Sequence, residues 1–369
     1  MVRFDLDGLA ARLRGRRVGL VATPASWTVA DGHLLDALLA RGVDLRVLVA
    51  LEHGFRGELQ DGADVGRYAD TATGLPVLSF YGAGRVAPEA MVADVDVLVF
   101  QVQDVTHRAY TFHQAMAELL AAAARAGKTL LVLDRPTPLA HLGPRGLTGT
   151  QFFPLPFPML PGLTMGELAK WLAAENGWTA ALDVVPVPGW RRRDRWMRTG
   201  LPWIPPSPNI PTVASAYAYA CTGLVQHTSV SEGRGTCRPF EYVGAPFLDG
   251  GRLAAALNAL RLPGVAFRPL HFQPGFNKFA GQVCSGVQLL IRDPGRIDPP
   301  LVGLALLREC ARQAPAEFAL QPAFAAWLDN GDWTPERLAG LDLAAIRDRM
   351  RADAAAFRHR TDPFRLYPE

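Results

Sequence analysis

The strongest constraint on the fold is a series of short apolar runs in the first part of the chain, each ending in polar residues. Helical patterns follow several of them, such as the alanine-rich residues 110–126, which Gly127 is expected to end. Strands that are apolar throughout and alternate with helices form parallel sheets covered on both faces. The sequence therefore predicts an α/β fold in which residues 1–150 form a Rossmann-like domain with a parallel sheet. Its expected strands are residues 17–22, 45–51, 76–80, 95–100 and 129–133.

Nucleotide-binding sheets of this kind carry glycine-rich turns that cradle phosphates, and this chain lacks them. Residues 22–26 read ATPAS where a dinucleotide-binding protein has G-x-G-x-x-G. No Walker-type loop is found either. We therefore expect no nucleotide and no other cofactor.

A second, smaller mixed α/β domain is expected over residues 151–369, closing a cleft against the first. The proline-rich segment 152–158 is predicted to be a stiff connector that marks the boundary. Residues 201–212 contain too much proline for a helix or a central strand, which suits a rigid wall beside a ligand. The remaining elements are expected to be helices near 164–176, 252–260, 301–313 and 335–357 and strands near 184–187, 265–271 and 286–291.

Composition excludes several classes of function. The 369 residues are 49% hydrophobic and carry a net charge of +3, which gives no support for a general nucleic-acid or membrane-surface partner. Residues 1–17 contain no apolar core of a secretory signal, and no run approaches the ~20 apolar residues of a membrane span. We expect a cytoplasmic protein whose four cysteines, which lack metal-type spacing, are reduced.

Polar residues at the ends of the expected strands are the first candidate site. Because the carboxyl ends of parallel strands share one edge of the sheet, these residues can converge on one crevice. Glu52 comes directly after the second strand. Gly54 and Gly57 follow it and allow the chain to turn sharply there. The full set at this edge is Glu52, His53, Arg56, Tyr81, Gln103, Asp104, Arg108, Tyr110, Asp134 and Arg135.

A second glycine-flanked loop, residues 231–236, repeats the combination of an acid and an arginine found near Glu52. It contains Ser231, Glu232 and Arg234, and the proline-rich wall before it contains Asn209. We expect this loop to face the sheet edge across the cleft, so that both acids meet in one pocket.

Six motifs along nearly the whole chain resemble those of the NamZ-type exo-β-N-acetylmuramidases. They read EHGFRG at 52–57, QDVTHRAYT at 103–111, LDRP at 133–136, TGLPW at 199–203, PSPNIPT at 206–212 and SEGRGTCRPFE at 231–241. The resemblance implies a Rossmann-like domain joined to a smaller α/β domain, with the site between them. It also implies a glycosidase that removes terminal N-acetylmuramic acid from the non-reducing end of peptidoglycan fragments, with Glu52 as the catalytic acid.

Three positions depart from the family pattern. The family usually has a glutamate at the position of Gln226, often an acid at Gln101, and an asparagine at Thr137. Family members are often secreted, whereas this chain shows no leader, which favours imported muropeptide pieces as substrates. If the acid at position 226 is needed for chemistry, activity is altered or lost in this chain.

Glycosidases usually need two carboxyl groups, one of which protonates the leaving oxygen. We assign Glu52 as this acid and rank Glu232 and Asp104 equally for the second group. His53 is expected to orient an acid or the sugar. The lactyl carboxylate of muramic acid can be bound by an arginine in two-pronged fashion, and the candidates are Arg108, Arg135 and Arg234.

Two alternatives remain open at this level. A metal-dependent hydrolase would use His53, Asp104, His107 and Asp134, although no pair of them has a standard spacing such as H-E-x-x-H. A non-catalytic protein that binds amino sugars is the other alternative, because Gln226 replaces an acid. Loss of activity in a chelator would support the former, and sugar binding without turnover the latter.

Overall fold

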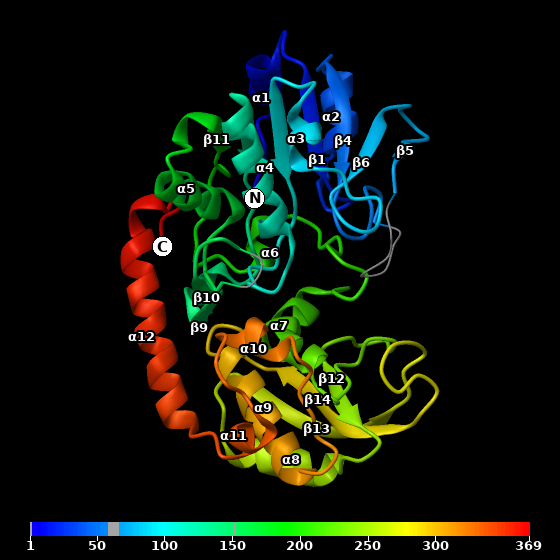
Figure 1. The fold of residues 1–369 in the computed structure, drawn as a ribbon, viewed down its shortest axis with the longest axis vertical. Coiled ribbons are helices and arrows are strands. Elements are labelled where there is room, and N and C mark those ends of the chain that lie inside the picture. The colour runs from blue at the N-terminus through cyan, green and yellow to red at the C-terminus, as the bar shows by residue number, and fades with distance from the viewer. Residues whose placement is uncertain (1, 58–65, 151–152) are drawn as a thin grey trace.

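The computed structural model describes residues 2–57, 66–150 and 153–369. Two bodies make up the molecule: an upper one with a large sheet, and a lower one with a small antiparallel sheet (Figure 1). A long C-terminal helix, α12 (Leu343–Thr361), runs along the side of both (Figure 1). The predicted α/β class, a Rossmann-like sheet with a smaller mixed α/β part, is confirmed.

The large sheet has the strand order β11-β8-β7-β1-β4-β6-β5. All of its neighbouring strands are parallel except β5 and β6, which are antiparallel. The five predicted strands are present, and their bounds are β1 (Val18–Ala22), β4 (Leu45–Ala50), β6 (Pro76–Ser79), β7 (Val97–Gln101) and β8 (Thr129–Leu133). The remaining two are β5 (Tyr68–Ala69) and β11 (Leu182–Val185).

Helices cover both faces of this sheet, because successive strand residues point to opposite sides. On one face, Leu98 belongs to an apolar cluster that also contains residues of α3 (Pro88–Val92), α4 (Phe112–Ala126) and α5 (Met165–Asn176). Val99 packs on the other face, with α1 (Leu6–Leu13) and α2 (Leu34–Ala40). The apolar strands are thus buried on both faces, as their continuous patterns predicted.

The segment after residue 150 differs from the expected connector. Phe157 and Pro158 belong to strand β10 (Phe157–Leu160), which pairs antiparallel with β9 (Arg145–Gly149). Proline is tolerated there because this sheet has two strands and leaves each with an open edge. Beyond the hairpin, β11 still joins the large sheet. Residues after 150 therefore contribute to the first body, and a boundary at 150 stays a prediction; residues 151–152 lie outside the described residues.

The second body packs helices against an antiparallel sheet of order β12-β14-β13. Its strands are β12 (Tyr242–Ala245), β13 (Val265–Phe272) and β14 (Cys284–Ile291). One predicted helix, 335–357, is two helices, because Asp342 caps the start of α12 through its side chain. The helices are α7 (Val213–Thr222), α8 (Gly250–Ala259), α9 (Pro299–Gln313), α10 (Phe324–Leu328), α11 (Pro335–Ala339) and α12.

Within the part of the chain that the structure describes, no helix has both the length and the apolar character to cross a membrane. The expected cytoplasmic location stays a prediction.

Candidate active site

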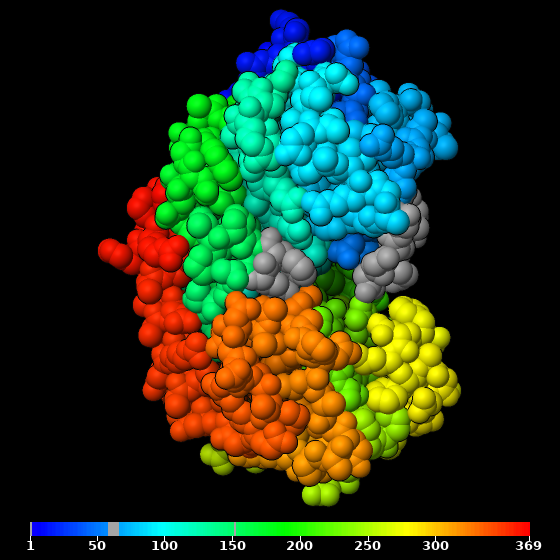
Figure 2. All heavy atoms as spheres, viewed as in Figure 1, coloured from blue at the N-terminus to red at the C-terminus, as the bar shows by residue number. Residues whose placement is uncertain are grey.

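A pocket of about 300 Å³ lies where the two bodies meet. Figure 2 shows the surface hollowed between them, below blue atoms of the first body and beside green and yellow atoms of the second. The structure places five of the predicted site residues on the pocket wall: Glu52, His53, Tyr110, Asn209 and Arg234. The other described residues that line it are Ala109, Thr111, Ser207, Ile210, Tyr219, Gln226, Phe240 and Trp327.

Glu52 reaches the pocket because the chain turns sharply after β4. His53 and Gly54 both have left-handed backbone conformations, with φ of 78° and 84°. This conformation is uncommon for a residue with a side chain, and it places the buried His53 on the pocket wall beside Glu52. The Thr111 hydroxyl, at the start of α4, donates a hydrogen bond of 2.6 Å to Oε2 of Glu52. The carboxylate is thus held at a fixed place in the pocket.

Thr111 is itself held from behind by Tyr81, whose hydroxyl donates to the Thr111 carbonyl at 2.7 Å. Tyr81 does not line the pocket, so its part in the predicted site is to support Thr111. Arg56 also lies off the pocket wall. Its guanidinium makes a two-pronged pair with the buried Asp70, at 3.0 and 2.9 Å.

Glu232 is buried beneath the pocket wall and bound by two cations. Arg234 Nε donates to Oε1 at 2.5 Å, and Lys278 Nζ donates to Oε2 at 3.0 Å. Burial by itself would raise the pKa of Glu232, but Lys278 and Arg234 lower it, and the net shift is downward. Both carboxylate oxygens are engaged, and Glu232 does not line the pocket. The expectation that Glu52 and Glu232 meet in one pocket is therefore wrong, because the side chain of the 231–236 loop that lies on the pocket wall is that of Arg234.

Asp104 lies in the interior and not on the pocket wall. Its Oδ1 accepts from the Thr106 amide, and its Oδ2 has no partner among the described residues. Burial raises the pKa of Asp104 to about 7, although the Thr106 hydrogen bond opposes this. The structure thus leaves Asp104 as a buried acid behind the site.

This raised pKa predicts a pH dependence of stability. Since the pKa of Asp104 is about 7 when folded and 3.8 when unperturbed, the folded chain binds the proton more tightly. The stability that this bound proton gives the folded chain is complete below pH 4 and is lost as the pH rises through 7. We expect Asp104→Asn to gain stability relative to the wild type by roughly 1 kcal/mol per pH unit between pH 5 and 7, and to gain little more between pH 7 and 8. Urea unfolding of both proteins at pH 5, 6, 7 and 8 measures this difference, and parallel curves would contradict it.

Three predicted residues form a buried network away from the pocket. Asp134 Oδ2 accepts from the hydroxyls of Thr164 and Tyr367, each at 2.6 Å. Arg135 Nε donates to Oε1 of Gln103 at 3.1 Å. Through Tyr367 this network ties the first body to the end of the chain. Gln103, Asp134 and Arg135 therefore hold the fold together. The prediction that they line the pocket is wrong.

Ser231 and Arg108 are also placed elsewhere. Ser231 Oγ accepts from the Gly233 amide at 3.1 Å and shapes the loop that carries Arg234. Arg108 is fully buried and donates to backbone carbonyls, among them that of Leu147 at 2.8 Å. Neither side chain lines the pocket.

Several pocket residues were not among the predicted site residues. The aromatic side chains of Tyr219, Phe240 and Trp327 lie on the wall with Tyr110. Tyr219 comes from α7, which the capping box of Thr212 and Ser215 signals in the sequence. Trp327 comes from α10, and no sequence signal connects it with the other residues.

The side chains of the metal alternative do not gather at the pocket. Of His53, Asp104, His107 and Asp134, His53 alone lines it. Among the residues described, no group of three or more His, Cys, Asp or Glu side chains could hold a metal ion.

Comparison with known proteins decides the family. A family model for the N-terminal domain of the exo-β-N-acetylmuramidase NamZ matches residues 18–214, and one for its C-terminal domain matches residues 217–367. The chain belongs to the NamZ family. The two family models meet inside α7, so they divide the chain later than residue 150.

Individual relatives agree with the NamZ assignment. The peptidoglycan β-N-acetylmuramidase NamZ of Bacillus subtilis (strain 168) is 39% identical over 315 residues, which are 83% of this chain and 76% of the relative. A crystal structure of a DUF1343 family protein from Bacteroides fragilis NCTC 9343 is 31% identical, with a TM-score of 0.87 over 98% of this chain and 97% of that one. A second such protein from the same strain is 26% identical, with a TM-score of 0.78 over 99% and 98%. The predicted family, its fold and its glycosidase class are confirmed.

Of the three departures from the NamZ pattern, Gln226 alone lies on the pocket wall. Its Nε2 donates to the Gly223 carbonyl at 2.8 Å. Gln101 is buried at the end of β7, and the Thr137 hydroxyl donates to the Asp104 carbonyl at 3.4 Å. The departure at position 226 is therefore the one that changes a side chain on the pocket wall.

Proposed function

We propose that the pocket binds a terminal β-linked N-acetylmuramic acid residue at the non-reducing end of a peptidoglycan fragment, and that Glu52 protonates the glycosidic oxygen. The observation that carries this is the position of Glu52. Of the three acids proposed from the sequence, it alone lines the pocket, where the Thr111 hydroxyl fixes it.

The shape and lining of the pocket support an exo-acting glycosidase. At about 300 Å³ it is at the small end of ligand pockets, which suits one sugar residue rather than a length of chain. Aromatic side chains such as Tyr110 and Trp327 offer apolar surface to a sugar ring, and Asn209 and Ser207 offer polar groups to its hydroxyls.

In the reaction the Glu52 carboxyl gives its proton to the glycosidic oxygen as the bond from that oxygen to C1 breaks. Water then adds to C1 and releases one proton to solvent, and Glu52 takes up a proton from solvent. The carboxamide of Gln226 is a hydrogen-bonding group on the same wall and can orient the sugar or the water.

The function is tested with a disaccharide that carries N-acetylmuramic acid at its non-reducing end, and with a matched disaccharide that carries N-acetylglucosamine there. We expect chromatography with mass detection to show free N-acetylmuramic acid from the first and little release from the second. Binding of the first disaccharide by calorimetry without any release would instead support the non-catalytic sugar-binding alternative.

A further inference from the structure

A buried carboxylate beneath the pocket wall holds two cations in a fixed arrangement. Glu232 accepts from Arg234 and Lys278, and these side chains have exposures of 1%, 12% and 18%. Lys278 also donates to the carbonyls of Val225 and Val230, at 3.0 and 2.8 Å. Its three donors are thus directed at three acceptors, so that Lys278 fixes Glu232, and Glu232 fixes Arg234.

The cluster of Glu232, Arg234 and Lys278 has one positive charge in excess, and Arg234 is the member that lines the pocket. Because Nε of Arg234 is directed at Glu232, the guanidinium is held at one edge and cannot rotate freely. A guanidinium held in a fixed orientation on a pocket wall is suited to binding a carboxylate.

We infer that Arg234 binds the lactyl carboxylate, the group that distinguishes N-acetylmuramic acid from N-acetylglucosamine. This rests on the proposed function, since it assumes that the pocket holds this sugar. Of the three candidate arginines, Arg108 and Arg135 are buried in structural hydrogen bonds off the pocket wall. Arg234 determines specificity, while Glu232 and Lys278 are positioning residues.

The arrangement also gives Glu232 a role other than second catalytic carboxyl. A catalytic base or nucleophile must reach the sugar, and both oxygens of Glu232 are occupied by cations beneath the wall. Its negative charge instead holds together two largely buried cations, either of which would be costly to bury alone.

The test measures binding of free N-acetylmuramic acid, of its lactyl amide and of N-acetylglucosamine by calorimetry, so it does not depend on turnover. The wild type is expected to bind N-acetylmuramic acid about 10- to 100-fold more tightly than the two uncharged sugars. Arg234→Gln should remove this preference and leave the affinity for N-acetylglucosamine within about threefold. Arg234→Lys should be intermediate, because it keeps the charge and loses the fork.

The positioning role is tested with Glu232→Gln, which should lower the preference for N-acetylmuramic acid over N-acetylglucosamine. A loss of stability alone would not change that ratio. The matched control is Arg238→Gln, a half-exposed arginine that pairs with Glu241 at 3.4 Å and does not line the pocket, and it should keep the preference.

Equal affinity of the wild type for the sugar and its lactyl amide would overturn the assignment, and this measurement needs no variant. A preference for N-acetylmuramic acid that survives in Arg234→Gln would overturn it as well. Failure of the proposed function looks different, because binding would still depend on Arg234 while no disaccharide is hydrolysed.

Discussion

Replacing Glu52 with glutamine is expected to lower kcat on a chromogenic β-N-acetylmuramide by about 10³-fold, in the range that general acid catalysis contributes. Glutamine has the shape of glutamate, and its amide oxygen can still accept the Thr111 hydrogen bond, so the pocket should keep its form. What it lacks is the proton that the leaving oxygen needs. Affinity for N-acetylmuramic acid should therefore stay within a few-fold of the wild type.

The leaving group distinguishes an acid from other roles for Glu52. A dinitrophenyl glycoside departs without protonation, so Glu52→Gln should lose much less activity on it than on an alkyl glycoside. Glu118→Gln is a matched control, because Glu118, which lies on α4, pairs with Arg85 and does not line the pocket. A Glu52→Gln enzyme that keeps more than a tenth of its activity on the alkyl glycoside would place the catalytic acid elsewhere.

The sequence predicted the large sheet well because its signal is local. The five strands that were predicted for the sheet are short, largely apolar runs, and such runs are typical of parallel strands that are buried on both faces. The position of Glu52 followed from the same pattern, since a residue just beyond the end of a parallel strand lies at the ligand-binding edge.

The same reasoning failed at Asp134 and Gln103, which also follow strands. Asp134 is covered by Tyr367, near the C-terminus, which returns to the first body after α12. A strand pattern shows which edge a residue reaches, but it does not show what later segments pack over that edge. Lys278 and Trp327 were missed for the same reason, since each meets the site only through the folding of the second body.

Replacing Arg108 with methionine is expected to lower the free energy of unfolding by about 3 kcal/mol or more, as for a buried charged group removed from its partners. The guanidinium donates to the carbonyls of Leu147 and Trp327, at 2.8 and 3.1 Å, and to those of Phe157 and Leu328. It therefore joins the β9–β10 hairpin to α10, and methionine would leave all four carbonyls without this donor.

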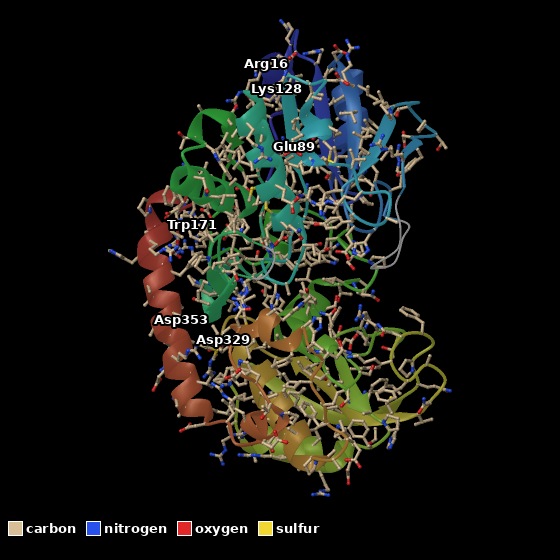
Figure 3. All side chains as sticks on the ribbon, in the orientation of Figure 1. Arg16, Glu89, Lys128, Trp171, Asp329 and Asp353 are labelled. Carbon is tan, nitrogen blue, oxygen red and sulfur yellow. The ribbon has the colours of Figure 1, made fainter. Side chains whose placement is uncertain are left out.

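Acidic side chains around Arg108 favour its charged form. Burial lowers the pKa of Arg108 to about 10, and Asp329 and Asp353 oppose that shift, so the group stays cationic at neutral pH. Figure 3 shows Asp329 beyond α10 and Asp353 on α12, near the β9–β10 hairpin. The same charge that sequence reasoning assigned to the substrate thus serves the contact between the two bodies.

Arg125→Met is the matched control for Arg108→Met, because Arg125 is an exposed arginine of α4 that pairs with the exposed Glu89, labelled in Figure 3. Its loss should change the unfolding free energy by no more than about 0.5 kcal/mol. Urea unfolding of the two variants and the wild type measures the difference. If Arg108→Met unfolded at the wild-type urea concentration while KM for the muramide rose, Arg108 would bind substrate as its motif suggested, and the structural role derived from its four carbonyl partners would be wrong.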